Sequence, residues 1–381
     1  MIVLFYITLC LIFAYGILIN YYARAWKTIP PVDAKALRDW KENIKITVII
    51  PARNEEKHIT RCLSSLQQQT YSKALLEIIV VNDHSTDATE NLVLGFPASN
   101  VRLINLAEYV DGKPLNAYKK KAIEIAIGKS SGDLIVTTDA DCIAPPDWIR
   151  CLAACQHNQK AVFIAAPVKI EAGPSLLSIF QSIDFMTLQG ITGASVFKKF
   201  HSMCNGANLA YEKKIFYEVG GFKGIDYLAS GDDMLLMHKI AIRYPDKVFF
   251  VKSQSAIIST QATETWKAFF HQRIRWASKA DKYEDKRIFT VLLLVYLLNL
   301  FILSFLILGI WNKNALLLFL TLVLAKTSVE FSFVWNIALF FNQQKLMIYF
   351  PFLQPLHIVY TVIAGWLGKF GSYQWKGRNV K

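Results

Sequence analysis

Three groups of polar residues each follow a short run of β-branched residues. ITVII leads into PARNEE (51–56), EIIVV leads into NDHSTD (82–87), and DLIVTT leads into DAD (139–141). Runs of this kind are typical of strands buried on both faces of a parallel sheet. Ligands bind beyond the carboxyl ends of such strands. The pattern therefore predicts one shared ligand site at one edge of the sheet.

Asp139 and Asp141 are the candidate metal ligands. Two carboxylates at i and i+2 after a strand can hold one hard divalent cation, whose other positions take diphosphate oxygens. Acids also occur in ordinary turns and helix caps, but the strand before these two ends in polar Thr137 and Thr138. No glycine-rich phosphate loop follows any strand. We therefore expect metal and side chains, with candidates in Lys113 and the lysine run 119–121, to neutralise a diphosphate.

The nucleoside of such a ligand has its own candidate residues. Asp83 ends the second strand, where its carboxylate could accept from a base N–H or a ribose hydroxyl. Arg53 and Glu55 are further candidates for holding the nucleoside. For Asp87 and Glu56 we expect places at helix N-termini, where acids are favourable.

Further downstream, NGAN (205–208) and GGF (220–222) precede the sequence SGDD (230–233). Asp232 and Asp233 open a predicted helix at 234–243 and could simply complement its macrodipole. The alternative is that one of them is a general base.

The sequence QRIRW (272–276) stands shortly before a long apolar run. Gln272 and Arg275 share a helical face, with Trp276 beside them, so this face could belong to an active site. Arg273 points elsewhere and is expected to contact lipid headgroups. The amphipathic stretch 175–200 is expected to lie against the cytoplasmic leaflet, with core packing as the alternative.

Apolar runs make up much of the rest of the 381 residues, of which 53% are hydrophobic. About 20 apolar residues suffice to span a membrane. Lys326 and Glu330 lie within one run, four apart, and could neutralise each other. The predicted organisation is a membrane anchor at 1–23, a linker at 24–43, a soluble domain with interfacial helices at 44–285, and a membrane region with a basic tail at 286–381.

The expected orientation of the membrane crossings follows from the positions of basic residues beside the apolar runs. Arg24 and Lys27 follow the first apolar run, which we interpret as a retained anchor, so the soluble domain is expected in the cytoplasm. Crossings are expected near 291–311 and 315–341. The segment 346–370 contains two prolines, and we expect it to be kinked, re-entrant or interfacial rather than a straight crossing. The expected location is the bacterial inner membrane.

The net charge is +13, yet no nucleic-acid-reading motif is present, so we expect no nucleic-acid partner. Anionic membrane lipids and a phosphorylated substrate fit the charge better. The six cysteines contain no CxxC pair and are expected to be reduced core thiols.

The segment 44–285 alternates strands and helices, with helices expected at 56–69, 86–94 and 115–127. This order predicts an α/β fold with a mostly parallel sheet. PARNEE, VVNDHSTD, TTDADC, NGANLAY, SGDD and QRIRW, in that order, resemble the motifs of membrane-integrated family 2 glycosyltransferases, which include cellulose, hyaluronan and poly-N-acetylglucosamine synthases and ceramide glucosyltransferases.

The resemblance implies a GT-A fold, a nucleotide-sugar donor, commonly a UDP-sugar, and an inverting mechanism. It implies that Asp83 contacts the nucleoside and that Asp139 and Asp141 bind Mg²⁺ or Mn²⁺ with the diphosphate. Further implied roles are the base for Asp233, diphosphate contacts for Lys119, Gln272 and Arg275, and acceptor contacts for Asp232 and Trp276. The run of three lysines leaves the position of the basic residue open.

We therefore expect an enzyme that moves one sugar to a lipid acceptor. A processive polysaccharide synthase extending a glycan is the alternative, but it needs a channel, usually built from several crossings. A non-catalytic nucleotide-sugar-binding scaffold is a remote alternative, because both the paired acids and the base are present. The sequence leaves the sugar, the linkage and the oligomeric state open.

Overall fold

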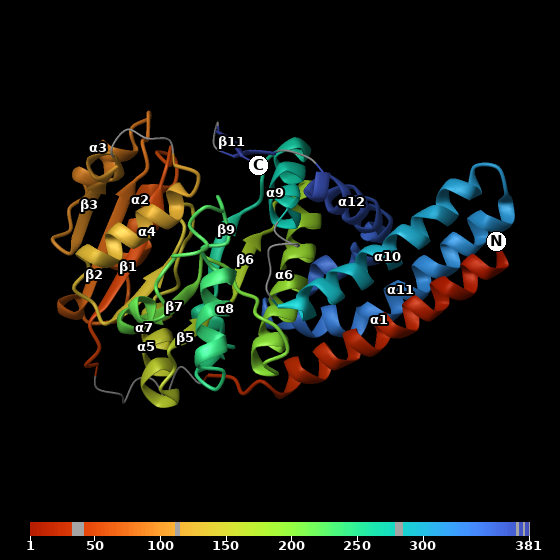
Figure 1. Cartoon of the computed structure of the whole chain (residues 1–381), viewed down its shortest axis with the longest axis horizontal. Helices are drawn as coiled ribbons and strands as arrows, with labels where there is room; N and C mark the ends of the chain where they lie inside the picture. Colours follow the sequence, from red (N-terminus) through yellow and green to blue (C-terminus); the bar gives the residue numbers. More distant parts are fainter. Residues whose placement is uncertain (33–41, 111–114, 279–284, 371–372, 376–377, 381) are drawn as a thin grey trace. The chain divides into compact units, whose positions relative to one another are not determined.

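The computed structural model describes residues 1–32, 42–110, 115–278, 285–370, 373–375 and 378–380 (Figure 1). Residues 33–41 of the predicted linker, residues 111–114 and 279–284 of the predicted soluble domain, and part of the basic tail lie outside these ranges. The chain forms two compact units. The first comprises Met1–Thr28, Ile170–His201 and Ala262–Lys381, and the second comprises Ile29–Lys169 and Ser202–Gln261.

The second unit is built on a seven-stranded sheet in the order β3-β2-β1-β4-β7-β5-β8 (Figure 1). β7 is antiparallel to β4 and β5, and the other pairings are parallel. The expectation of a mostly parallel sheet is thereby confirmed. The strands are β1 Ile46–Ala52, β2 Leu76–Asn82, β3 Val101–Asn105, β4 Leu134–Thr137, β5 Phe163–Ala165, β7 Leu209–Glu212 and β8 Val248–Phe250.

The helices of this unit pack on a sheet whose central strands are almost wholly buried. The four helices predicted at 56–69, 86–94, 115–127 and 234–243 are all present, with ends shifted by a few residues at most. The helices are α2 Ile59–Gln67, α3 Thr89–Leu94, α4 Tyr118–Lys129, α5 Trp148–Gln159, α7 Lys213–Glu218 and α8 Met234–Arg243. β6 Val168–Glu171 and β9 Ile258–Gln261 form a separate two-stranded sheet.

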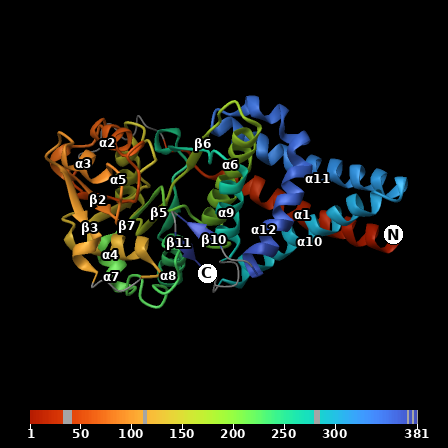
Figure 2. The same ribbon diagram turned by 90° about the horizontal axis from the view of Figure 1, so that it is seen from above.

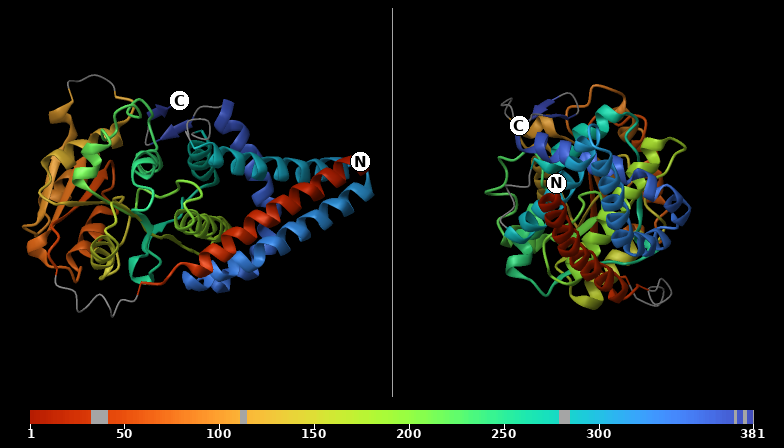
Figure 3. Two further views of the ribbon diagram at one scale, coloured as in Figure 1. Left: turned by 60° about the horizontal axis from the view of Figure 1, so that its bottom comes forward. Right: turned by 90° about the vertical axis from the view of Figure 1, so that its right-hand side faces the viewer.

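The first unit consists mainly of helices, among which α1, α10 and α11 pack side by side (Figure 3). α1, α10, α11 and α12 are long and apolar enough to cross a membrane, judged by length and composition. Many of their large apolar side chains are exposed, as lipid-facing residues would be. The elements are α1 Ile2–Thr28, α6 Leu176–Phe197, α9 Trp266–Ala277, α10 Lys286–Gly309, α11 Lys313–Phe340, α12 Phe350–Phe370, β10 Tyr373–Trp375 and β11 Arg378–Val380 (Figure 2).

The segment predicted to be broken by prolines contains one continuous helix, α12. Pro351 lies in its first turn, where the missing N–H would have no helical partner. Pro355 lies further inside, and the helix continues through it. The segment therefore has the length and hydropathy of a crossing.

Lys326 and Glu330 form the predicted pair within α11. The Lys326 Nζ lies 2.7 Å from Glu330 Oε1, and both side chains are buried. Gln354 bridges them by accepting from Lys326 and donating to Glu330, and Tyr15 donates to the same carboxylate at 2.6 Å. The prediction that the two charges neutralise each other is confirmed.

Two expectations of leaflet contact are wrong. Most residues of α6 are buried, with contacts to α1 and α11, as the core-packing alternative states. Arg273 is only 4% exposed, and its guanidinium lies 2.6 Å from Asp184 on α6 instead of facing headgroups. It also stacks 4.2 Å from the ring centre of Trp276. A buried arginine requires a charged partner, which α6 supplies.

The cysteines of the described residues form no disulfide. Five of them are buried, in agreement with the prediction of core thiols, and Cys10 on α1 is exposed.

His201 lies in the loop after α6, and its buried side chain should make the stability of the first unit depend on pH. Its Nε2 lies 2.9 Å from the Tyr22 hydroxyl and 3.1 Å from that of Ser195. Burial lowers its pKa from 6.5 to about 4, against an opposing effect of Asp285. The unfolded chain therefore gains a proton before the folded one, and the unit should lose stability as the pH falls from 6.5 to 4. We expect thermal unfolding at several pH values to show this loss, and His201→Gln to reduce it.

Candidate active site

The polar groups after the strands meet at one edge of the sheet, as their order in the sequence predicts. β1 and β2 end in register at Ala52 and Asn82, and β4 runs parallel beside β1 up to Thr137. β7 is antiparallel, so its first residue, Leu209, pairs with Thr137 at the same edge. The sequence NGAN before β7 therefore joins the loops after β1, β2 and β4.

Arg53 and Asp83 form the part of this edge next to β1 and β2. The Arg53 guanidinium donates to the carbonyls of Asp83 and His84 at 2.9 and 3.2 Å. The Asp83 side chain is 5% exposed, and its Oδ1 lies 3.0 Å from His84 Nδ1. The Glu55 backbone N–H donates to the Thr89 hydroxyl, which ties the loop after β1 to α3.

The two acids expected at helix N-termini lie beside α3. Asp87 accepts from the backbone N–H of Thr89, the first residue of that helix. Glu56 accepts from the N–H of Ala88 and in return donates its own N–H to Asp87. These contacts agree with the expected placement near the start of a helix.

Lys119, Asp139 and Asp232 form a charged cluster at the end of β4. The Lys119 Nζ lies 2.7 Å from Asp139 Oδ1 and 3.5 Å from Asp232 Oδ2. Burial lowers the pKa of Lys119, but Asp139 and Asp232, with Asp233, act in the opposite direction and raise it above its usual value. Lys119 therefore carries a positive charge among these carboxylates.

The structure separates the three lysines of the run on α4. Lys120 is buried and donates to the carbonyls of Leu228 and Ser230. Lys121 is partly exposed and pairs with Glu124 on its own helix. Lys119 is thus the lysine of this run that reaches the acidic cluster.

Asp233 is held by two backbone amides. Its Oδ2 accepts from Gly206 N–H at 3.0 Å, and its Oδ1 accepts from Met234 N–H at 2.7 Å. It therefore caps α8, as the macrodipole alternative predicts, while its contact with Gly206 joins it to NGAN. Gly206 lies close to the acids, and an added Cβ there would lie 3.2 Å from Asp232 Oδ2.

Asp139 and Asp141 provide oxygen donors for a cation. Asp141 Oδ2 accepts from the Thr260 hydroxyl at 3.2 Å, and the Asp139 side chain is 40% exposed. The neighbouring thiols of Cys62 and Cys142 are poor ligands, because burial and the two aspartates raise the pKa of each above its usual value. Asp139 already contacts an ammonium, so a cation is chemically suited to this place.

Within the described residues, no three His, Cys, Asp or Glu side chains gather into a ready-made metal centre. A divalent ion held by Asp139 and Asp141 would therefore depend on further oxygen ligands, such as phosphate oxygens and water. The residues fit the metal that the sequence implies, with a diphosphate as its partner.

Gln272, Arg275 and Trp276 belong to α9 in the first unit, and their surroundings are described there alone. The helix begins after Thr265, whose hydroxyl accepts from Ala268 N–H. The Trp276 ring lies on the Arg273 guanidinium and 6.0 Å from the Phe185 ring. The Trp276 ring therefore packs against the buried guanidinium of Arg273.

Several residues that hold the site are not evident from the sequence. The buried Thr137 hydroxyl donates to the Gly206 carbonyl. Asn208 is fully buried, accepts from the Trp148 indole and donates to two backbone carbonyls. Asn208 is part of a recognisable motif, but its contacts lie far away in the sequence, and so do those of Thr260.

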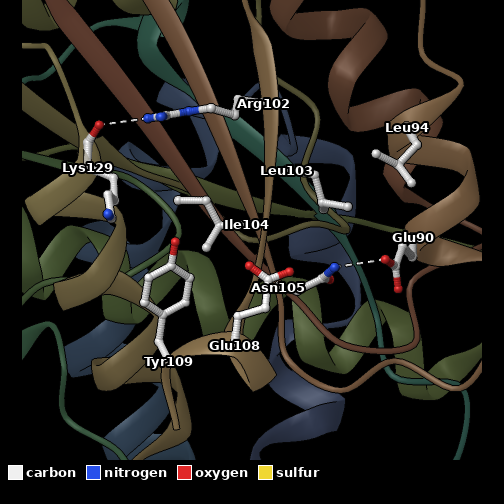
Figure 4. A pocket seen from close by; sticks show the side chains of 9 residues that line it. All are labelled: Glu90, Leu94, Arg102, Leu103, Ile104, Asn105, Glu108, Tyr109 and Lys129. Carbon is white, nitrogen blue, oxygen red and sulfur yellow. Dashed lines mark hydrogen bonds between the residues drawn. The ribbon is translucent and has the colours of Figure 1, made fainter.

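A separate pocket of about 350 Å³ lies beside the edge strand β3. Figure 4 shows Asn105 donating to Glu90 on one side of it and Arg102 donating to the Lys129 carbonyl on the other. None of the predicted site residues lines this pocket. The predicted site residues therefore lie outside this pocket.

Comparison with known proteins identifies related sequences. The family model described as Glycosyl transferase family 2 matches residues 47–220. The model described as Glycosyl transferase family group 2 matches residues 134–362, more than half of the chain.

Two curated relatives and one solved structure illustrate the similarity. "Probable glycosyltransferase YdaM" of Bacillus subtilis is 32% identical over 247 residues, which cover 62% of this chain and 56% of that protein. Poly-beta-1,6-N-acetyl-D-glucosamine synthase of Staphylococcus aureus is 25% identical over 236 residues, covering 61% and 53%. The matched part of the chain thus spans just over half the length of these relatives.

The structure of a mannosyltransferase from Pyrobaculum calidifontis, in complex with GDP-Man and Mn²⁺, aligns with a TM-score of 0.56. The alignment covers 93% of this chain and 99% of that one at 19% identity. This likeness confirms the expected GT-A fold.

Proposed function

The chain belongs to glycosyltransferase family 2, and we propose that it transfers one sugar from a UDP-sugar to a hydroxyl of a membrane lipid. The observation that carries this proposal is the cluster of Lys119, Asp139, Asp232 and Asp233 at the ligand-binding edge of the sheet. The four helices suited to crossing a membrane support a membrane-borne acceptor.

The donor is held in parts by different loops. Arg53, Glu55 and Asp83 surround the nucleoside, and Asp83 accepts hydrogen bonds from it. Asp139 and Asp141 bind Mg²⁺ or Mn²⁺, which neutralises charge on the diphosphate when bound. The Lys119 ammonium donates to the phosphate oxygens and stabilises the departing nucleoside diphosphate, a role that the family resemblance also implies for Gln272 and Arg275. The mannosyltransferase of the same fold was solved with a nucleotide sugar and Mn²⁺, consistent with this arrangement.

Asp233 acts as the general base in a single displacement, and Asp232 helps to bind the acceptor. The Asp233 carboxylate takes the proton of the acceptor hydroxyl as that oxygen attacks the anomeric carbon. The bond to the diphosphate breaks on the opposite face, so the anomeric configuration inverts. The diphosphate leaves unprotonated, and no second carboxylic acid is required, in contrast to glycoside hydrolysis.

We propose that the second unit lies in the cytoplasm and that the membrane is the bacterial inner membrane. Arg24 and Lys27, in the last turns of α1, favour this orientation. Cytoplasmic nucleotide sugars then have direct access to the acidic cluster.

A processive synthase is the second candidate function, favoured by the similarity to a poly-N-acetylglucosamine synthase. Both candidates are tested by incubating the purified protein in lipid vesicles with UDP- and GDP-sugars and a total lipid extract, followed by mass spectrometry. A lipid carrying one added sugar supports the first proposal. A polymer supports the second, and no transfer from any UDP-sugar would overturn the donor assignment.

Trp276 is assigned to the acceptor side. Its replacement by Ala should slow transfer far more than it weakens membrane association, because the ring offers a flat surface for a sugar or lipid head. Transfer rate and flotation with vesicles are the two measurements, and Trp266→Ala on the same helix is the matched control. Loss of flotation without a larger loss of transfer would make Trp276 an interfacial anchor.

A further inference from the structure

Lys119 occupies the position next to Asp139 that a metal ion is proposed to take. Its ammonium contacts Asp139 at 2.7 Å and Asp232 at 3.5 Å, and its side chain is 20% exposed. We propose that Lys119 substitutes for the metal ion in the empty enzyme and moves to the diphosphate when the donor binds. The inference rests on the proposed function, because it takes Asp139 as a metal ligand.

Two cations cannot share the Asp139 carboxylate without repulsion. A divalent ion needs negatively charged oxygen ligands, and the closest oxygen of Asp139 is already neutralised by Lys119. Binding of the metal alone therefore competes with the contact between Lys119 and Asp139. This competition weakens metal binding in the absence of a nucleotide.

A diphosphate changes this balance because it offers Lys119 a new anionic partner. The lysine side chain has a flexible four-carbon stem and three donors, so its ammonium can turn without movement of α4. Gly206 borders the ammonium: an added Cβ there would lie 3.4 Å from Nζ.

The neighbouring lysines cannot perform this exchange. Lys120 is buried against two backbone carbonyls, and Lys121 pairs with Glu124 on the outer face of α4. Lys121 therefore provides a matched control of the same charge on the same helix.

The exchange makes metal and nucleotide bind cooperatively. If the nucleotide draws Lys119 away from Asp139, it raises the affinity for metal, and the metal must raise the affinity for nucleotide by the same factor. Typical coupling of this kind is about 5- to 150-fold. Lys119 thus makes the site bind metal mainly when the donor is present.

The test measures Mn²⁺ binding by the full chain in detergent, by electron paramagnetic resonance of free Mn²⁺, with and without UDP. Lys119→Met should bind Mn²⁺ alone roughly tenfold more tightly than the unchanged protein, a value within the usual range of coupling. UDP should strengthen Mn²⁺ binding less in this variant than in the unchanged protein. Lys121→Met should behave like the unchanged protein.

The outcomes separate the exchange from the proposed function. If Lys119→Met and a second variant, Lys119→Gln, bind Mn²⁺ alone no more tightly than the unchanged protein, the exchange is wrong, while sugar transfer by the unchanged protein still supports the proposed function. If both variants gain equally with and without UDP, Lys119 exerts only a general charge effect and the exchange is also wrong. If the unchanged protein binds no Mn²⁺ even with UDP, the metal assignment fails together with the exchange.

Discussion

Replacement of Asp233 by Asn is expected to lower the rate of sugar transfer by roughly 10²- to 10⁴-fold, the usual contribution of a general base. The amide cannot take the proton of the acceptor hydroxyl. Asn is as good a helix cap as Asp, so α8 should keep its start, although the amide can accept from only one of the two backbone amides that now contact Asp233. The affinity for UDP should change little.

The measurements are the initial rate of transfer and the binding of UDP to the same preparation. Asp147→Asn is the control, because Asp147 also stands directly before a helix of this unit but lies outside the cluster. A transfer rate for Asp233→Asn within a few-fold of the unchanged protein would rule out Asp233 as the base. Loss of UDP binding would instead indicate a structural role.

The second large effect is expected on stability, from Asp184. Asp184→Asn leaves the guanidinium of Arg273 without its charged partner inside the first unit. Breaking a buried ion pair by removal of one partner costs about 3–5 kcal/mol. Asp184 also accepts from the Tyr360 hydroxyl at 2.6 Å, so the change affects α6, α9 and α12 together. Thermal unfolding in detergent should show a clear loss of stability.

A double replacement distinguishes the ion pair from general disturbance of the helices. Asp184→Leu with Arg273→Met removes both charges, and such exchanges are often close to neutral in stability. We therefore expect the double variant to be more stable than Asp184→Asn. Equal loss in both variants would mean that packing, and not the charge pair, determines the effect.

The strands and helices that form the site could be predicted because their signals are local. β1, β2 and β4 are β-branched runs that end in polar residues, and this pattern alone places their loops at one edge. β7 could not be placed in this way, since its antiparallel pairing with β4 depends on contacts far along the sequence. The position of NGAN at the same edge therefore could not be predicted from the sequence.

The lysine run shows why single side chains are harder to predict. Successive residues of a helix point about 100° apart, so Lys119, Lys120 and Lys121 face in three directions. Which one reaches Asp139 depends on how α4 packs on the sheet. The sequence narrows the choice to three residues and cannot go further.

The prediction that Arg273 contacts lipid headgroups is wrong for a related reason. A basic residue before an apolar run usually lies near lipid headgroups. Its partner, Asp184, comes from α6, and neither helix shows this pairing in its own sequence. Lys326 and Glu330 could be paired correctly because their spacing of four residues makes the contact within one helix.

The single displacement by Asp233 is tested most directly by the anomeric configuration of the product. The protein in vesicles is given the UDP-sugar that it uses, in which the sugar is α-linked to the diphosphate, and the first product is analysed by proton NMR. Inversion predicts a β-linked sugar in the product. An α-linked product would contradict the single displacement and the role of Asp233 as its base.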